Sequence, residues 1–198
     1  VDINDYHDFG KLFPFLTLLS GRGCRAKCTF CQLPQVMNGH SYRTRSVDNV
    51  CDEIEYDKKL FPNLQEIMFE DDTLTMRSSQ DRLVELCEAM IRRNLNISWS
   101  ANARVDVNDL EVLKLMKRSG CRWLCVGFEF GDQQVLNNVK KGATVAHMHR
   151  FAHNAHSAGI RVHGCFMFGG RGETTETARK TLALSQQLPI DTAQFTAV

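Results

Sequence analysis

The chain has 198 residues, of which 43% are hydrophobic and 24% are charged, and its formal net charge is +1 at pH 7. This length suits one domain with a sizeable core, and this composition excludes a largely disordered chain. The even charge balance argues against a nucleic-acid-binding face, and no stretch is apolar for long enough to cross a membrane.

Strand-like and helix-like patterns alternate along the whole chain. In chain order they predict a strand at 13–19, a helix at 46–60, a strand at 66–69, a helix at 81–93, a strand at 97–101, a helix at 107–118, a strand at 123–128, a helix at 145–158, a strand at 160–168, a helix at 173–188 and a strand at 191–198. Ser46 and Thr144 are the expected N-caps of two of these helices. The alternation predicts a parallel α/β sheet, either doubly wound or in a (β/α) barrel.

Polar or glycine-rich segments follow five of the predicted strands. They are residues 24–31, 70–72, 102–104, 129 and 169–173, after the first to the fifth strand respectively. In a barrel the carboxyl ends of all strands open on one face, so these segments would converge on one site. In an open doubly wound sheet they would spread along an edge. We therefore favour a TIM-type (β/α) barrel over the open sheet.

The segment after the first predicted strand is rich in cysteine. Cys24, Cys28 and Cys31 lie there, just after Gly23. Thiolates at this spacing suit a metal ion or an iron–sulfur cluster. A structural zinc site needs four ligands, so His40 would have to be the fourth. Three thiolates on a four-iron cluster would instead leave one iron open for chemistry, and we favour this interpretation.

The segment Cys24-Arg-Ala-Lys-Cys28-Thr-Phe30-Cys31 resembles the signature of the radical S-adenosylmethionine (SAM) superfamily, including Phe30 just before the third cysteine. The resemblance implies a 4Fe-4S cluster on the three cysteines, with the amino and carboxylate groups of SAM on the fourth iron. It implies an enzyme in which an electron from the cluster breaks SAM into methionine and a 5′-deoxyadenosyl radical, which takes hydrogen from a substrate. The implied fold is the radical SAM core, a partial (β/α)6 barrel, over residues 1–198.

Two segments near the middle of the chain extend the resemblance to SAM binding. Glu70, Asp71 and Asp72 resemble the segment that receives the SAM ammonium, in the form of cobalamin-associated members. Arg104 is placed to pair with the methionine carboxylate, which suits a guanidinium fork. An acidic residue at a strand end can also be a helix N-cap, and Arg104 alone could be a surface charge.

Two later segments also resemble cofactor-binding positions of this family. Glu129, in Gly127-Phe-Glu129-Phe-Gly131, resembles a glutamate that contacts SAM. Gly169 and Glu173 belong to a segment that resembles the adenine-binding motif after the fifth strand. The resemblance therefore covers nearly the whole chain and predicts one cofactor site built from five strand ends.

The other cysteines are not predicted to be ligands. Cys51 and Cys87 lie on apolar helix faces and are expected in the core. Cys121, Cys125 and Cys165 flank two strands. A second cluster there is the alternative, but we favour burial as small hydrophobic residues, which strand alternation explains. Cys125 and Cys165 could still point into the barrel.

Three histidines share one face of the helix predicted at 145–158. His149, His153 and His156 could bind a metal, but we expect them to form a solvated stripe.

Eight cysteines in a chain with such regular helix and strand patterns indicate a reducing compartment and not a disulfide framework.

Residues 39–49 and 136–142 resemble a narrower branch, the radical SAM proteins associated with hopanoid biosynthesis. This implies the bacterial cytoplasm, a small-molecule or lipid-linked substrate, and an electron donor such as flavodoxin or ferredoxin. Because the chain begins with Val and not Met, we expect a fragment without the cobalamin-binding and C-terminal domains. The alternatives are a cobalamin-dependent radical SAM methyltransferase and, from another class, a non-catalytic zinc or iron–sulfur binding module.

Overall fold

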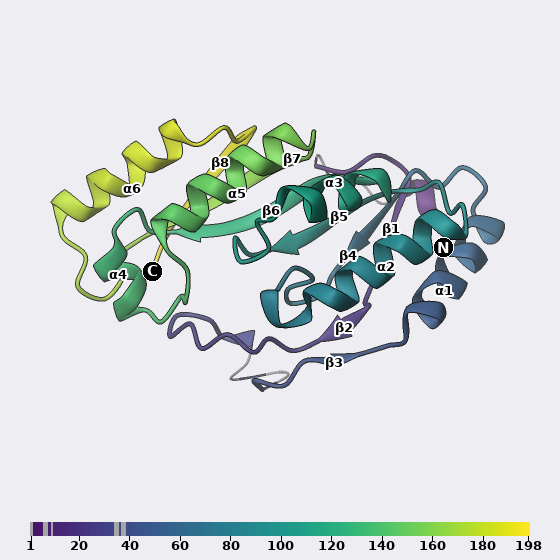
Figure 1. Ribbon diagram of the computed structural model, residues 1–198, viewed down its shortest axis with the longest axis horizontal. Helices are drawn as coiled ribbons and strands as arrows, with labels where there is room; N and C mark the ends of the chain where they lie inside the picture. Colours follow the sequence, from purple (N-terminus) through teal and green to yellow (C-terminus); the bar gives the residue numbers. More distant parts are fainter. Residues whose placement is uncertain (1, 6–7, 9, 34–35, 37–38) are drawn as a thin grey trace.

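Six parallel strands form one sheet in the order in which they occur in the chain (Figure 1). The structure is a computed structural model that describes residues 2–5, 8, 10–33, 36 and 39–198. The strands, in sheet order, are β1 (Phe15–Leu18), β4 (Glu66–Phe69), β5 (Ser98–Ala103), β6 (Cys121–Glu129), β7 (Arg161–Phe168) and β8 (Thr192–Ala197). Each predicted strand corresponds to one strand of this sheet, so the predicted parallel α/β fold is confirmed.

The sheet has two free edges. These are β1 and β8, and in the ranges that the structure describes they do not pair with each other. The barrel is therefore partial and does not close. All six residues of β8 are exposed. The carboxyl ends of the strands still point in one direction because every pairing in the sheet is parallel.

The helices between the strands form a continuous row beside the sheet (Figure 1). Helix α1 (Val47–Leu60) packs against α2 (Gln80–Arg92), and α2 packs against α3 (Leu110–Arg118). Helix α3 packs in turn against α5 (Val145–Ser157), and both α5 and α6 (Thr175–Gln187) lie against β7. No helix of the described ranges is long and apolar enough to cross a membrane.

The ends of these helices are set by local sequence. The Ser46 side chain accepts a hydrogen bond from the backbone N–H of Asn49, and Thr144 does the same for His147. These bonds satisfy N–H groups that a helix terminus leaves without an intrahelical partner. Gly159 follows α5 with φ +75°, a left-handed conformation that glycine adopts without strain. Both predicted N-caps are confirmed.

The core lies between the sheet and the row of helices. Buried helix residues are Val50, Ile54, Leu83, Leu86, Leu113, Met116, Met148 and Phe151, and buried strand residues include Ile67, Phe69, Trp99, Leu124, Val126 and Phe128. Burying such a side chain contributes about 1.5–3 kcal/mol, so this interface dominates the stability of the fold. Cys51, Cys87 and Cys121 are fully buried there, as expected of core cysteines.

Several short elements lie outside the prediction. They are the antiparallel pair β2 (Gly21–Arg22) and β3 (Arg43–Thr44), the helix α4 (Gln133–Asn138), and the 3-10 helices η1 (Ile3–Asp5) and η3 (Arg77–Ser79). Elements of two to six residues are too short to show a hydrophobic period. Helix α3 begins at Leu110 and not at residue 107, because the Asp109 side chain caps its first N–H groups.

Candidate functional site

A cavity of about 260 Å³ opens beside the carboxyl ends of β5 and β6 and is bordered by the loop after β2. Its walls bring together segments that are far apart in the chain. The predicted metal- and cofactor-binding residues that line it are Cys24, Cys28, Phe30, Cys31, Asp72, Arg104 and Glu129. The convergence expected of strand carboxyl ends is therefore observed for the first four predicted strands.

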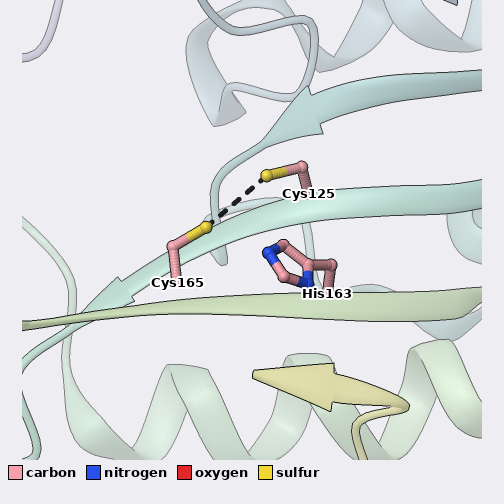
Figure 2. A group of neighbouring side chains, drawn as sticks. All are labelled: Cys125, His163 and Cys165. Atoms are coloured by element: carbon pink, nitrogen blue, oxygen red, sulfur yellow. Dashed lines mark hydrogen bonds between the residues drawn. The ribbon is translucent and has the colours of Figure 1, made fainter. Parts of the chain in front are cut away.

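Two further cysteines form part of the strand wall of this cavity. Cys125 of β6 and Cys165 of β7 both line it, and their Sγ atoms lie 3.5 Å apart (Figure 2). The hydrogen bond between the two thiols lowers the pKa of Cys125 and raises that of Cys165. The sequence left open whether these side chains point inward, and the structure places both toward the cavity.

The cysteine loop, residues 24–31, is anchored to the scaffold mainly through its backbone. The N–H of Gly23 donates to Asp72 Oδ2 at 2.6 Å, and the N–H of Thr29 donates to the carbonyl of Val139 at 3.0 Å. The three cysteine side chains are only partly buried. Burial raises the pKa of the Cys24 thiol, and a backbone hydrogen bond and the charge of Arg104 oppose that shift.

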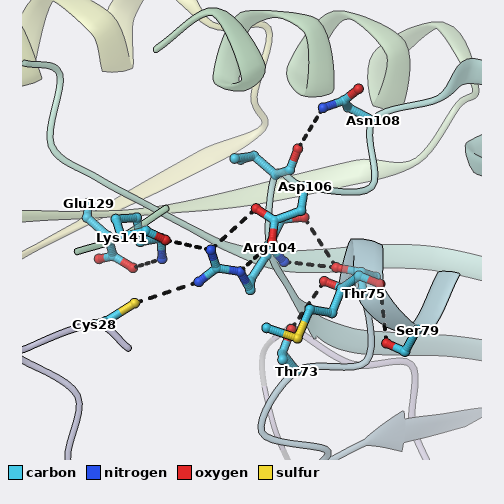
Figure 3. Close-up of polar contacts among 11 residues, drawn as sticks. Cys28, Thr73, Thr75, Ser79, Arg104, Asp106, Asn108, Glu129 and Lys141 are labelled. Atoms are coloured by element: carbon cyan, nitrogen blue, oxygen red, sulfur yellow. Dashed lines mark hydrogen bonds and ion pairs between the residues drawn. The ribbon is translucent and has the colours of Figure 1, made fainter. Parts of the chain in front are cut away.

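Arg104 extends from the end of β5 into the cavity and is fixed on several sides (Figure 3). Its Nε donates to Asp106 Oδ2 at 2.8 Å, and its Nη2 donates to the backbone carbonyl of Lys141 at 2.6 Å. Its Nη1 lies 3.7 Å from Cys28 Sγ. Because the residue is only 7% exposed, Arg104 is a held, buried cation at the cysteine loop, and the surface-charge alternative does not apply.

Glu129, at the end of β6, forms a buried ion pair beside Arg104 (Figure 3). Its Oε1 accepts from Lys141 Nζ at 2.7 Å, and the side chains are 10% and 6% exposed. Glu129 has φ +69°, at a register shift in the pairing of β6 with β7. A Cβ at Gly127 would displace the Glu129 carboxylate and the Lys141 ammonium from their present positions. The sequence reasoning missed Lys141, although it lies within residues 136–142 quoted for the narrower resemblance.

The three acidic residues that follow β4 do not all line the same cavity. Asp72 lines the cavity, whereas Glu70 lines a different cavity of about 610 Å³ beside β2 and β3. Asp71 is fully buried and accepts hydrogen bonds from the Ser20 N–H and hydroxyl and from the Tyr42 hydroxyl. Successive side chains at this strand end point in different directions. The structure therefore brings one of the three predicted carboxylates to the cysteine loop.

The remaining predicted residues differ in their position. The Phe30 ring packs against the core, with Lys141 Nζ 5.9 Å from its centroid. Gly169, with φ +94°, donates its N–H to the Glu173 carboxylate in the turn after β7. Neither Gly169 nor Glu173 lines the cavity. Glu173 Oε1 is buried without a hydrogen-bond partner among the described residues. This turn is thus separate from the cysteine-lined site.

Fold and site together define an enzyme class: a partial parallel α/β barrel whose cavity combines a three-cysteine loop with buried charged groups. The sequence model of the radical SAM superfamily matches residues 18–184. The chain therefore belongs to the radical SAM superfamily, an enzyme family whose cofactors are a 4Fe-4S cluster and SAM.

Curated relatives include methyltransferases. An uncharacterized methyltransferase of Pyrococcus horikoshii is 31% identical over 183 residues, which cover 92% of this chain and 39% of the relative. The bacteriochlorophyllide d C-12(1)-methyltransferase of Chlorobaculum tepidum is 29% identical over 188 residues, covering 93% of this chain and 40% of the relative. The chain thus spans about 40% of the length of these relatives.

A solved structure and one more relative bear on the narrower resemblance. The radical SAM methyltransferase TsrM of Kitasatospora setae, solved with cobalamin and a 4Fe-4S cluster, superposes with a TM-score of 0.83 at 22% identity, covering 92% of this chain and 36% of that one. This likeness shows the fold. The hopanoid C-3 methylase of Methylococcus capsulatus is 27% identical over 155 residues, covering 77% of this chain and 28% of the relative. Similarity to cobalamin-associated and hopanoid radical SAM proteins, expected from the sequence, is confirmed.

Proposed function

We propose that Cys24, Cys28 and Cys31 hold the 4Fe-4S cluster of this domain and that Arg104 and Glu129 bind SAM beside it. The observation that carries this proposal is that the three thiols, the buried guanidinium and the buried carboxylate all border one cavity. A non-catalytic metal-binding module would need the thiols alone. The charged groups behind them would then be buried at a cost in desolvation without a role.

The donor set fits a cluster with one open iron. Cysteine thiolates are the ligands of 4Fe-4S clusters, and three of them leave the fourth iron for another ligand. The Arg104 guanidinium lies 3.7 Å from Cys28 Sγ, so a positive charge stands beside one of the three proposed cluster ligands. When bound, the cluster supplies the electron that cleaves SAM.

The polar groups suit the charged end of SAM. Asp106 and the Lys141 carbonyl hold the Nε and Nη2 side of Arg104, which directs the Nη1 side to the cysteine loop. We assign this side to the methionine carboxylate, because a hydrogen bond between a guanidinium and a carboxylate is assisted by both charges and is therefore strong. Asp72 lines the same cavity and is the assigned partner of the SAM ammonium. Glu70 and Asp71 have other positions and are not part of this assignment.

Glu129 and Lys141 support the other side of the ligand. The carboxylate of Glu129 is oriented by Lys141 Nζ and can accept a hydroxyl hydrogen bond from the ribose of SAM. Phe30 packs beside Lys141 and fixes the end of the cysteine loop. Gly169 and Glu173 lie outside the cavity, so we assign them to the adenine end, where a longer ligand would leave it.

For the reaction, we infer cobalamin-dependent methyl transfer in the longer protein. The three relatives described above are named as methyltransferases or a methylase, and the superposed TsrM structure holds cobalamin. Cobalamin would be bound by a domain outside this chain. The second candidate is hydrogen abstraction by the 5′-deoxyadenosyl radical without cobalamin, since the radical SAM core itself serves either reaction.

The substrate and setting follow from the same relatives. We propose a small-molecule or lipid-linked substrate, with a hopanoid lipid as one candidate because the hopanoid C-3 methylase is a relative. A bacterial cytoplasmic setting would supply flavodoxin or ferredoxin as the electron donor. Labelled methyl transfer from SAM with the full-length protein and cobalamin would support the methyltransferase. Stoichiometric 5′-deoxyadenosine without methyl transfer would favour hydrogen abstraction.

The decisive experiment is anaerobic reconstitution with iron and sulfide, followed by dithionite and SAM and an assay for 5′-deoxyadenosine. We expect a four-iron cluster and 5′-deoxyadenosine from the wild type. In Cys28→Ala we expect cluster assembly and SAM cleavage to be abolished, because one of three ligands is missing. Cys87→Ala, which removes a buried cysteine of α2, is the matched control and should keep both.

The assignment of ligands would be wrong if Cys28→Ala kept the full iron and sulfide content. Binding of zinc without any cluster would instead support the non-catalytic module. A cluster without SAM cleavage in this chain would call for the same assay in the full-length protein, because substrate contacts and cobalamin can come from its other domains.

A further inference from the structure

A second set of metal-ligand side chains lies beside the proposed cofactor site. Among the described residues, Cys125, His163 and Cys165 offer ligand atoms that all lie within 4.8 Å of one another (Figure 2). Cys125 pairs with His163 across β6 and β7, and Cys165 is two residues further along β7. Alternate residues of a strand share a face, so strand register alone brings all three side chains together.

The geometry of the two sulfur atoms suits one tetrahedral ion. Their separation is 3.5 Å. Two thiolates at Zn–S distances of about 2.3 Å and a tetrahedral angle lie about 3.8 Å apart. Little movement of either strand would therefore be needed for both thiolates to bind the same ion.

His163 is held in an orientation that suits a metal ligand. Its Nδ1 lies 2.8 Å from Thr192 Oγ1, and its ring is 5.6 Å from that of Trp123, centroid to centroid. Figure 2 shows one ring nitrogen turned toward the two sulfur atoms. The other nitrogen, Nε2, lies 3.4 Å from Gln194 Oε1, and zinc binding would replace this contact. A hydroxyl partner at Nδ1 then fixes the tautomer that presents Nε2 to the metal, as outer-shell partners commonly arrange.

We propose that Cys125, His163 and Cys165 bind a zinc ion, separate from the three cysteines assigned to the cluster. Zinc is bound by thiolate and imidazole ligands, and binding here releases the two thiol protons to solvent. Two thiolates balance the charge of Zn²⁺, so the complex is neutral and its desolvation cost is small.

The proposed zinc ion has one coordination position open for a ligand from the cavity. Three protein ligands leave the fourth position open, as in catalytic and not structural zinc sites. Cys125 and Cys165 line the same cavity as the cysteine loop, so this fourth position faces that cavity. The zinc would bind an oxygen or thiolate group of a molecule that enters the cavity and would hold it near the proposed SAM site.

The first test uses the full chain with Cys24, Cys28 and Cys31 all replaced by alanine, so that no cluster forms. Titration with Co²⁺ should give one equivalent with the intense visible bands of tetrahedral thiolate ligation, and Zn²⁺ should displace it. Adding Cys125→Ala should abolish the spectrum, whereas adding Cys87→Ala should leave it unchanged. No such spectrum, or one that survives Cys125→Ala, would overturn the proposal.

The second test keeps the cluster in place. It therefore decides the question even if the variant without the three loop cysteines does not fold. Reconstituted wild type, given zinc and then desalted, should retain one zinc per chain beside its iron. His163→Phe keeps an aromatic ring against Trp123 and should lose the zinc but not the iron; His156→Gln, at an exposed position of α5, should keep both. Wild type that retains no zinc would refute the site, and so would a Cys125–Cys165 disulfide in anaerobic protein.

A third variant tests the support of the histidine. Thr192→Val removes the hydroxyl that contacts His163 Nδ1 and should weaken zinc binding by about tenfold. Unchanged affinity would show that the contact does not orient a ligand and would count against the proposed coordination.

Discussion

The cysteine loop and the charged network at the strand ends meet in one cavity, yet they are held in place in different ways. The loop, residues 24–31, has partly buried thiols and is tied to the scaffold by backbone contacts to Asp72 and Val139. The network consists of the buried Arg104, Glu129 and Lys141 and the partly buried Asp106. Its hydrogen bonds, one of them to the Lys141 backbone carbonyl, measure 2.6–2.8 Å.

This difference shows how the site divides its tasks. Charged groups in a poorly hydrated place are costly unless paired, so the network must already be complete in the folded protein. A loop whose thiols face a cavity contributes little to stability and can adjust to what it binds. Substitutions in the loop should therefore change cofactor content, and substitutions in the network should change stability as well.

The largest expected effect on stability is that of Arg104→Met. It leaves Asp106 and the Lys141 carbonyl without their buried donor, so the free energy of unfolding should fall by about 3 kcal/mol. Cys28→Ala, measured in the same protein without cofactor, should change it by less than about 1 kcal/mol. Urea unfolding followed by circular dichroism measures both.

The control for this comparison is Arg93→Met. Arg93 pairs with Asp48, Asp52 and Glu55 in a surface ion network, so its loss should cost less than the loss of Arg104. If the two arginine variants lowered the free energy of unfolding equally, burial would not make the Arg104 network more important for stability than a surface ion network.

A smaller expected effect is the pH dependence of stability that Asp71 causes. Asp71 accepts hydrogen bonds from Ser20, which lies just before the cysteine loop. Burial raises the pKa of this carboxyl, against hydrogen bonds from Ser20 and Tyr42. The folded protein then binds the proton more tightly than the unfolded chain, whose pKa is near 3.8. Stability should therefore fall as pH rises from about 4 through the folded pKa, by at most about 1.4 kcal/mol per pH unit.

Asp71→Asn tests this dependence because the amide does not titrate. The difference in unfolding free energy between wild type and Asp71→Asn should change with pH above about 4 and become constant once the folded-state carboxylate is ionised. Asp81→Asn, on the exposed face of α2, is the matched control. A difference that is flat across this range would contradict the raised pKa.

Structural features that depend on residues near one another in the chain could be predicted from this sequence, provided that the segment is long enough to show a pattern. The six parallel strands follow from apolar runs separated by helical periods, because each run carries its own pattern. The cysteine spacing and Arg104 are equally local signals. The pair β2–β3 and helix α4 carry too few residues for any period to appear.

What the sequence could not predict depends on where strand ends turn and on strand register. Glu70, Asp71 and Asp72 are adjacent in the chain, but the turn after β4 sends them to three different surroundings. Lys141 reaches Glu129 from beyond α4, through a loop without a pattern. Cys125 and Cys165 meet because β6 and β7 pair in one particular register.

The smallest expected effect is that of His40→Ala, and it separates the cluster from a zinc module. His40 is exposed, and its Nδ1 contacts the carbonyl of Ala26 at 2.9 Å. If the cysteine loop holds a 4Fe-4S cluster through its thiolates alone, the variant should keep the wild-type iron content and rate of SAM cleavage. If the loop held zinc with His40 as fourth ligand, metal affinity should fall at least tenfold. Metal analysis of wild type and variant after identical reconstitution therefore decides whether three ligands or four define this site.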